Sequence, residues 1–165
     1  MVHHAGEHFP KLTVLENVLL AIGGLRRTKL VMWRPLSSYR ELHDKARRLL
    51  ADAGYWDRKN VEVRNLSHGE QRQVEIVLGL AGDPRILLLD EPAAGLASGE
   101  SREMAEFLKR LDPALAIVLI EHDMDVVFEV VSHISVLHFG RVVEEGATQD
   151  IRRSAKVQEI YLGTG

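Results

Sequence analysis

One short segment, ILLLDEP at Ile86 to Pro92, limits most strongly what this chain can fold into, because it joins an apolar run to two acids and a proline. A continuous apolar run of this length is typical of a parallel strand that is buried on both faces. Similar runs follow at Ala114 to Ile120 and Ile134 to Leu137, with helical patterns at Ser101 to Leu111 and Met124 to Val131. This alternation predicts an α/β fold that contains a βαβαβ half of a doubly wound parallel sheet.

The chain before Asp83-Pro84 has helical patterns only. Thr13 is a suitable N-cap for an apolar-periodic helix that Gly23-Gly24 would end. A second, amphipathic helix is expected from Ser37 or Ser38 to Ala53. The segment from Asp57 to Arg64 is expected to be a polar connector. The sequence therefore predicts a helical part that is followed by an α/β part.

The two ends of the chain have weaker patterns. Histidines 3, 4 and 8 invite a metal hypothesis, but Glu7 is the one carboxylate near them, so a solvated tail is the preferred interpretation. Near the other end we expect a hairpin around Gly140 and two short helices that begin at Thr148 and Ser154. We therefore divide the chain into an irregular tail (1–10), a helical subdomain (11–80), an α/β core half (84–147) and a C-terminal helical tail (148–165).

Composition excludes several classes of protein. The chain has 165 residues, 45% of them hydrophobic, which is enough for one ordinary globular core. A net charge of −3 gives no general attraction to nucleic acid. The absence of cysteine removes disulfides and thiolate metal sites and fits a reducing compartment. No apolar run reaches the roughly 18–20 residues of a membrane span, so we expect a cytoplasmic protein that meets a membrane only through partners.

The segment LSHGEQRQ at Leu66 to Gln73 has two interpretations. In the first, Ser67 is a helix N-cap and Glu70 its reciprocal partner, which is a common capping box. In the second, the Ser67 hydroxyl, the Gly69 N–H and the helix N-terminus together bind an anion. Capping alone would explain both residues, so the neighbouring motifs decide between the two.

The acids Asp90 and Glu91 have few structural uses at the end of a buried strand. Successive strand side chains point to opposite faces, so one acid can reach a metal ion while the other reaches a water molecule. The alternative is that both acids only close a loop. His122 follows the next predicted strand, within IEHDM, where a lone histidine is ordinarily a satisfied surface or core residue. Glu121 and Asp123, on either side of it, are interpreted as locally solvated acids.

These segments together resemble the ATP-binding cassettes of ABC transporters. LSHGEQR is similar to the family's LSGGQ signature, with His68 in place of its first glycine and Glu70 in place of its glutamine. The resemblance implies that Ser67, Gly69 and Glu70 contact the γ-phosphate of an ATP that is held mainly by the other subunit of a head-to-tail dimer. ILLLDEP is similar to the Walker B strand of the same family.

The same resemblance assigns roles to the remaining motif residues. Asp90 would hold Mg²⁺ through water, and Glu91 would orient and polarise the attacking water. His122 would be the switch histidine that hydrogen-bonds the γ-phosphate. Gly95 would belong to the D-loop that crosses the dimer interface, although Ala97 stands where an acid or amide is usual. The implied fold is a partial P-loop NTPase fold, in which a helical subdomain precedes a truncated parallel sheet with flanking helices.

The resemblance covers roughly Lys11 to Gly163 and has a narrower form. LTVLENVLLA, LIEHDMDVVFEV and the tail VQEIYLG are similar to the ATPases of branched-chain amino acid importers, with urea-type relatives close by. This implies a transport ATPase that uses ATP and Mg²⁺. Its implied partners are a second ATPase subunit, membrane permease subunits and, indirectly, a solute-binding protein. The resemblance does not name the transported solute, because specificity in such systems lies in the binding protein and permease.

The sequence contains no Gly-Lys dipeptide, whereas such ATPases cradle phosphates with a G-x-x-x-x-G-K-[ST] loop. No aromatic platform for adenine is visible, and the position of the family's Q-loop glutamine falls near His4. We therefore expect the isolated chain to bind nucleotide weakly and to show no measurable ATPase activity.

Three functional readings stay open. In the first, the chain is the C-terminal part of an importer ATPase, through truncation, a gene-model start placed too late, or a split gene. In the second, it is a non-catalytic product that offers only Ser67 and Gly69 in trans to another subunit's ATP. In the third, it is an ABC-type ATPase of DNA repair, which shares the signature and the acid pair but not the IEHDM context. The first reading is preferred.

Overall fold

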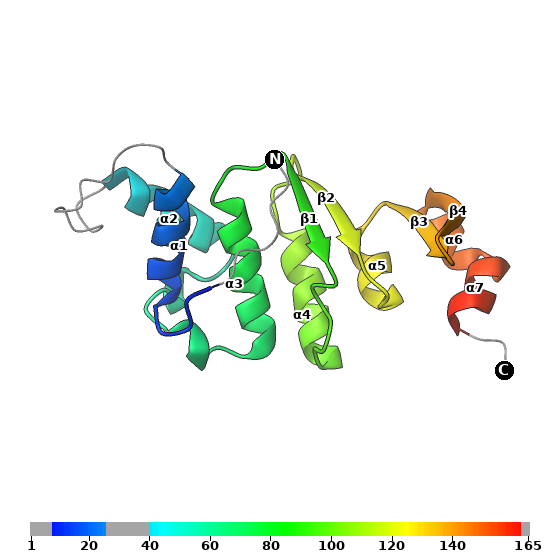
Figure 1. The fold of residues 1–165 in the computed structure, drawn as a ribbon, viewed down its shortest axis with the longest axis horizontal. Helices are drawn as coiled ribbons and strands as arrows, with labels where there is room; N and C mark the ends of the chain where they lie inside the picture. Colours follow the sequence, from blue (N-terminus) through cyan, green and yellow to red (C-terminus); the bar gives the residue numbers. More distant parts are fainter. Residues whose placement is uncertain (1–7, 26–39, 163–165) are drawn as a thin grey trace.

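Three groups of elements follow one another along the long axis of the molecule (Figure 1). The computed structural model describes residues 8–25 and 40–162. The first group is helical: α1 (Val14–Leu25), α2 (Arg40–Asp52), the 3₁₀ helices η2 (Trp56–Arg58) and η3 (Val63–Asn65), and α3 (His68–Leu80). The second group is β1 (Ile86–Asp90), α4 (Ser98–Lys109), β2 (Ala116–Ile120) and α5 (Met124–Val130). The third is β3 (His133–His138), β4 (Arg141–Ala147), α6 (Thr148–Arg153) and α7 (Ala155–Leu162).

Helix α1 begins where the sequence predicts and ends later. The Thr13 N–H and hydroxyl donate to Glu16 Oε2 at 2.7 and 2.8 Å, and the Glu16 N–H donates back to Thr13 Oγ1 at 3.2 Å. The predicted end at Gly23-Gly24 is wrong, because both glycines lie inside the helix. Ile22 is only 2% exposed, and burial of this kind outweighs a glycine penalty of roughly 1 kcal/mol. The predicted start of the second helix, at Ser37 or Ser38, lies outside the described residues.

The connector before α3 is ordered rather than merely polar. Besides η2 and η3, it pairs with the start of α1: the Val14 N–H donates to the Val61 carbonyl, and the Val63 N–H donates to the Leu12 carbonyl, both at 3.0 Å. Val63 is fully buried. The connector is therefore bonded to the segment at the start of α1.

Strands β1 and β2 are parallel and in register, with Ile86 opposite Ala116 and Asp90 opposite Ile120. Leu87 and Leu89 are 1% and 4% exposed and belong to the same core as Met104, Phe107 and Leu108 of α4. The opposite face is open, because Ile86, Val118 and Ile120 are 48%, 50% and 60% exposed. The prediction of strands buried on both faces is therefore wrong, since in the described part of the chain helices cover one face only.

Strand β3 does not join this sheet. It pairs antiparallel with β4 through a hairpin at Phe139-Gly140, where both residues have positive φ (46° and 73°). Figure 1 shows this hairpin well apart from β2. The predicted hairpin is confirmed, but the predicted third parallel strand is wrong. A partner two residues away along the chain costs little loop entropy, so the hairpin takes up the hydrogen bonds of β3.

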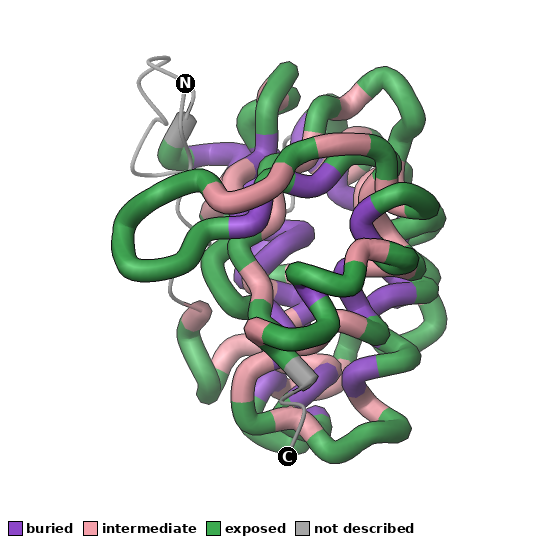
Figure 2. The backbone as a smooth tube through the Cα atoms, turned by 90° about the vertical axis from the view of Figure 1, so that its right-hand side faces the viewer, coloured by how far each residue is buried: buried purple, intermediate pink, exposed green. Residues whose placement is uncertain are grey.

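Buried residues form two main clusters. Figure 2 colours the buried residues purple along the backbone tube. The larger joins the helical group to β1 and α4. The smaller lies under the β3–β4 hairpin, where α5, α6 and α7 contribute Val127, Ile151 and Val157. Among the described residues, none of the helices is long and apolar enough to cross a membrane.

Candidate functional site

The acids of ILLLDEP lie where β1 ends. Asp90 is the last residue of the strand, and in the described part of the chain no hydrogen bond or ion pair engages its exposed carboxylate. The Glu91 N–H continues the sheet by donating to the Ile120 carbonyl at 2.8 Å. Glu91 then has φ 46°, a left-handed conformation that is rare outside glycine. The direction of its side chain is therefore set by this turn and not by the alternation of a strand.

The sheet brings Glu91 and His122 together. Glu91 Oε1 lies 3.3 Å from His122 Nδ1, and the two side chains are 50% and 67% exposed. Glu91 is the first residue after β1, and His122 is the second residue after β2. The two strands are parallel and end at the same level. An acid and an imidazole are thus accessible at one edge of the sheet, where parallel sheets bind ligands.

Glu121 is not the solvated acid that the sequence suggested. Its side chain is 1% exposed, and its two oxygens accept backbone N–H groups from Ala93, His122 and Asp123. Asp123 is also structural, because its Oδ1 accepts the N–H groups of Asp125 and Val126 and so caps α5. Sequence alone could not find the Glu121 contacts, because Ala93 is distant in the chain.

The capping box of α3 is present. Ser67 Oγ accepts the Glu70 N–H at 3.3 Å, and Glu70 Oε2 accepts the Ser67 N–H at 2.8 Å. The Glu70 carboxylate also pairs with Arg58. Glu70 is therefore engaged by its own helix start and its neighbour, while its proposed contact with a phosphate stays a prediction.

A carboxylate from α4 lies on the start of α3. Glu100 Oε1 accepts the Gly69 N–H at 3.3 Å, and Glu100 Oε2 accepts the Ala97 N–H at 3.3 Å. The Ala97 N–H, the Ser67 hydroxyl and the Gly69 N–H, in that order, hold the pKa of Glu100 below its usual range. A Cβ added at Gly69 would lie only 3.2 Å from the Glu100 Cβ, so glycine is needed for this approach. The site predicted to bind an anion thus already accepts one.

Gly95 lies in the loop between β1 and α4. Its φ of 75° favours glycine and turns the chain toward α4. In the described part of the chain, no hydrogen bond or ion pair joins Ser67 or Gly69 to Asp90, Glu91 or His122. We name these two separate groups by the roles that the resemblance implies: the signature surface (Ser67, Gly69) and the hydrolytic edge (Asp90, Glu91, His122).

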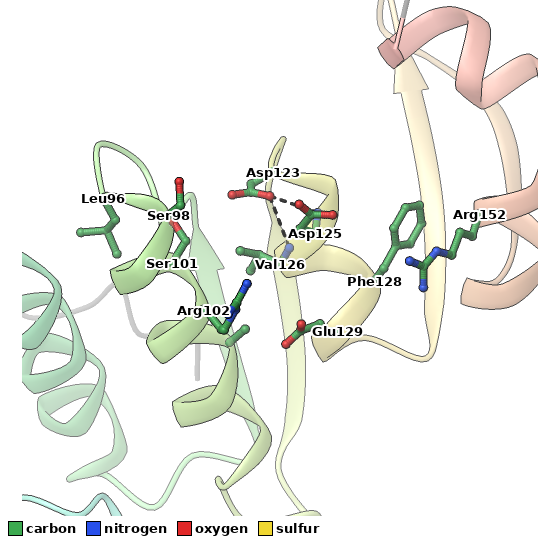
Figure 3. A pocket seen from close by; sticks show the side chains of 11 residues that line it. Leu96, Ser98, Ser101, Arg102, Asp123, Asp125, Val126, Phe128, Glu129 and Arg152 are labelled. Carbon is green, nitrogen blue, oxygen red and sulfur yellow. Dashed lines mark hydrogen bonds between the residues drawn. The ribbon is translucent and has the colours of Figure 1, made fainter.

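A cavity of about 460 Å³ adjoins the hydrolytic edge between α4 and α5 (Figure 3). Ser98, Ser101 and Arg102 line it from α4, and Asp123 and Asp125 line it from the start of α5. Asp90, Glu91 and His122 do not line it. The dashed lines in Figure 3 show that Asp123 is occupied in capping α5. This cavity is therefore not the place where the sequence predicts chemistry.

The metal hypothesis for the N-terminal histidines gains no support. The described residues contain no group of three or more His, Asp or Glu side chains that could hold a metal ion. His8 Nδ1 contacts Glu75 Oε1 at 3.0 Å, and His3 and His4 lie outside the described residues. The adenine platform and the Q-loop position near His4 are likewise not represented in the described residues.

The residues present fit Mg²⁺ and a phosphate group. Asp90 offers an exposed carboxylate, which is the oxygen ligand that Mg²⁺ prefers. The start of α3 offers the Gly69 N–H and the Ser67 hydroxyl, which suit a phosphate oxygen because they already accommodate a carboxylate.

Comparison with known proteins decides the family. Residues 1–94 match the sequence model of the family described as ABC transporter. The chain belongs to the ATP-binding family of ABC transporters. It is 35% identical over 156 residues to the probable branched-chain amino acid transport ATP-binding protein LivG of Archaeoglobus fulgidus, a match that covers 93% of this chain and 61% of that protein.

Other members of the ABC family show similar levels of likeness. The chain is 35% identical to the high-affinity branched-chain amino acid transport ATP-binding protein LivG of Escherichia coli K12, covering 94% of this chain and 64% of LivG. The solved ADP conformation of MJ1267, an ATP-binding cassette of an ABC transporter, matches at TM-score 0.72 and 26% identity, covering 93% of this chain and 64% of that one. The chain thus spans less than two thirds of the length of these relatives, and its predicted partial ABC ATPase fold is confirmed.

Proposed function

We propose that this chain supplies the signature surface and the hydrolytic edge of the ATP-binding subunit of an ABC importer for branched-chain amino acids or related small solutes. The observation that carries the proposal is the approach of Glu91 to His122 at 3.3 Å, directly after the exposed Asp90 at the end of β1. The similarity to LivG, a branched-chain amino acid transport ATP-binding protein, supports the choice of solute class.

Each residue of the hydrolytic edge has a distinct part. The Glu91 carboxylate accepts a proton or hydrogen bond from the attacking water and orients it. The His122 imidazole donates a hydrogen bond to a phosphate oxygen, and Asp90 would hold Mg²⁺, which would neutralise charge on the phosphate. Bound Mg-ATP supplies the phosphoryl group that is transferred to water. The accessible position of the pair suits this work, because substrate water must reach Glu91.

The signature surface acts in a second site. Ser67 and Gly69 bind phosphate oxygens of an ATP that another subunit holds, in the head-to-tail dimer of the family, and the phosphate replaces the Glu100 carboxylate at the Gly69 N–H. The partners are therefore a second ATP-binding subunit and the permease subunits through which the assembly meets the inner face of a membrane. A non-catalytic role, limited to this surface, is the second candidate. The hydrogen bond that the Gly69 N–H donates to the Glu100 carboxylate favours it, because this contact involves none of Asp90, Glu91 and His122.

The test measures phosphate release from Mg-ATP by the full chain, alone and mixed with a separate LivG-type fragment that contains the G-x-x-x-x-G-K-[ST] loop. We expect no release by the chain alone. The mixture should release phosphate, and Glu91→Gln should lower that rate by about 100-fold or more. Glu106→Gln is the matched control, because Glu106 is exposed on α4 and away from the edge.

Two results would contradict the proposal. The first is a mixture that never releases phosphate although both polypeptides are folded and associated. The second is a rate that Glu91→Gln leaves unchanged. A chain that stimulates an intact cassette through Ser67 but independently of Glu91 would establish the non-catalytic role instead.

A further inference from the structure

A buried carboxylate lies directly beneath the hydrolytic edge. The Glu121 side chain is 1% exposed, although the adjacent Glu91 and His122 side chains are 50% and 67% exposed. Burying an ionised carboxylate is costly unless hydrogen bonds replace its hydration. An apolar residue would fill this position without the cost of burying a charge. The hydrogen bonds that Glu121 accepts are therefore the reason to examine its role.

The two oxygens of Glu121 hold two different loops. Oε1 accepts the Ala93 N–H at 2.9 Å, in the loop that follows β1 and Glu91. Oε2 accepts the His122 N–H at 3.0 Å and the Asp123 N–H at 3.4 Å, in the loop that follows β2. Glu121 is therefore a bridge between the loop of the acid and the loop of the imidazole.

The Glu91 backbone is held on both sides of its unusual conformation. Before it, the Glu91 N–H bonds to the Ile120 carbonyl at 2.8 Å. After it, the Ala93 N–H bonds to Glu121. A non-glycine residue at φ 46° carries a penalty of about 1–2 kcal/mol, so the conformation persists only where neighbouring bonds fix it. The Glu121 bond is one of these.

We propose that Glu121 is a positioning residue, whose carboxylate fixes the loop of Glu91 relative to the loop of His122 and so maintains the approach of their side chains. This inference rests on the proposed function for its catalytic meaning. Glu121 acts through the two loops, and its Oε2 also lies 3.8 Å from His122 Nδ1, the ring nitrogen that faces Glu91. Without its carboxylate the loops keep their sheet bonds but lose their link to each other.

The first test uses nuclear magnetic resonance on the full chain. Glu121→Ala should accelerate hydrogen exchange of the Ala93 amide by about 10-fold or more, since it loses an acceptor that is charged and buried. Amides of the central α3 turn, such as Val74, should be unchanged. Glu106→Ala, which removes an exposed acid of α4, should leave the Ala93 amide as in the parent chain.

The second test asks whether the two side chains remain coupled. In the parent chain, Glu91→Gln should shift the ring nitrogen resonances of His122, because the carboxylate lies 3.3 Å from Nδ1. In the Glu121→Ala background the same substitution should shift them far less. A merely structural role for Glu121 would lower stability without removing this response. An equal shift in both backgrounds would overturn the proposal.

Glu121→Gln covers the case in which Glu121→Ala does not fold. It retains the volume and one acceptor oxygen, so it can hold one loop but not both. We expect faster exchange in one loop and a reduced His122 response; parent-like exchange at all three amides with a full response would refute the inference. These measurements use no nucleotide. The two proposals can fail separately. If the His122 response is lost in the Glu121→Ala background but Glu91→Gln does not change the rate of hydrolysis, the positioning role of Glu121 stands and the proposed function is rejected.

Discussion

Glu91 faces His122 across the ends of two adjacent parallel strands, with Oε1 3.3 Å from Nδ1. The register that pairs Asp90 with Ile120 brings both chains out of the sheet at the same level. The approach is therefore a product of the sheet and of the turn at Glu91. It leaves an acid and an imidazole in direct contact and accessible at one edge of the sheet.

The backbone at Glu91 predicts an unusual ranking of substitutions. Glu91→Gly and Glu91→Ala remove the same carboxylate, but only glycine adopts φ 46° without penalty. We expect Glu91→Gly to have a free energy of unfolding about 1 kcal/mol higher than that of Glu91→Ala. Urea unfolding followed by circular dichroism measures the difference. Equal stabilities, or a more stable alanine variant, would show that the left-handed turn is not strained.

The contact between Glu100 and the start of α3 should depend on pH. The pKa of Glu100 is lowered from its ordinary value of 4.5, chiefly by the Ala97 N–H and then by the Ser67 hydroxyl and the Gly69 N–H. A lowered pKa means that the stabilisation is present above the ordinary value and is lost as pH falls through the lowered one. The Gly69 and Ala97 amide resonances should therefore move together on acidification below 4.5.

Glu100→Gln provides the control for this titration. It preserves the shape of the side chain and has no proton to gain, so the two amide resonances should not move together in that variant. If they still titrate, another acid is responsible for the effect.

Two phenylalanines provide a matched test of the core. Phe107 on α4 is 0% exposed, whereas Phe139 in the β3–β4 turn is 93% exposed. Phe107→Ala should lower the free energy of unfolding by about 3–5 kcal/mol through lost burial and a cavity. Phe139→Ala should change it by no more than about 0.5 kcal/mol. Denaturant unfolding of both variants compares them, and similar losses would place Phe107 outside the core.

The open face of β1 and β2 should govern self-association. Val118 and Ile120 are 50% and 60% exposed on one face of that sheet, and exposed apolar sheet surface promotes aggregation. The double substitution Val118→Thr and Ile120→Thr keeps β-branched side chains and should raise the concentration at which the chain stays monomeric. Light scattering during size-exclusion chromatography measures this. Leu137→Thr, an exposed position on β3, is the control. If it raises the monomer concentration as much as the double substitution does, the open face of β1 and β2 has no special role in self-association.

Sequence patterns predicted the features that depend on neighbours in the chain. The capping boxes at Thr13 and Ser67 follow from residues three positions apart, and the end of β1 at Asp90 follows from an apolar run that stops at acids. His122 could be placed at the sheet edge because parallel strands end together.

Features that depend on distant contacts could not be predicted. The N–H of Ala93 meets Glu121 across 28 positions, and that of Gly69 meets Glu100 across 31. An acid looks equally polar in the sequence whether it is solvated or receives backbone hydrogen bonds. The sequence predicted the β3–β4 hairpin but also placed β3 in the parallel sheet. An apolar run does not specify the strand with which it pairs, so this second placement was wrong.

The separation of the two main clusters of buried residues has a consequence for how the molecule opens. No residue buried in the cluster beneath the β3–β4 hairpin is shared with the cluster that joins the helical group to β1 and α4. Cooperative units of a protein follow such divisions. The segment from β3 to α7 can thus come apart while Glu91, His122 and the start of α3 keep their contacts.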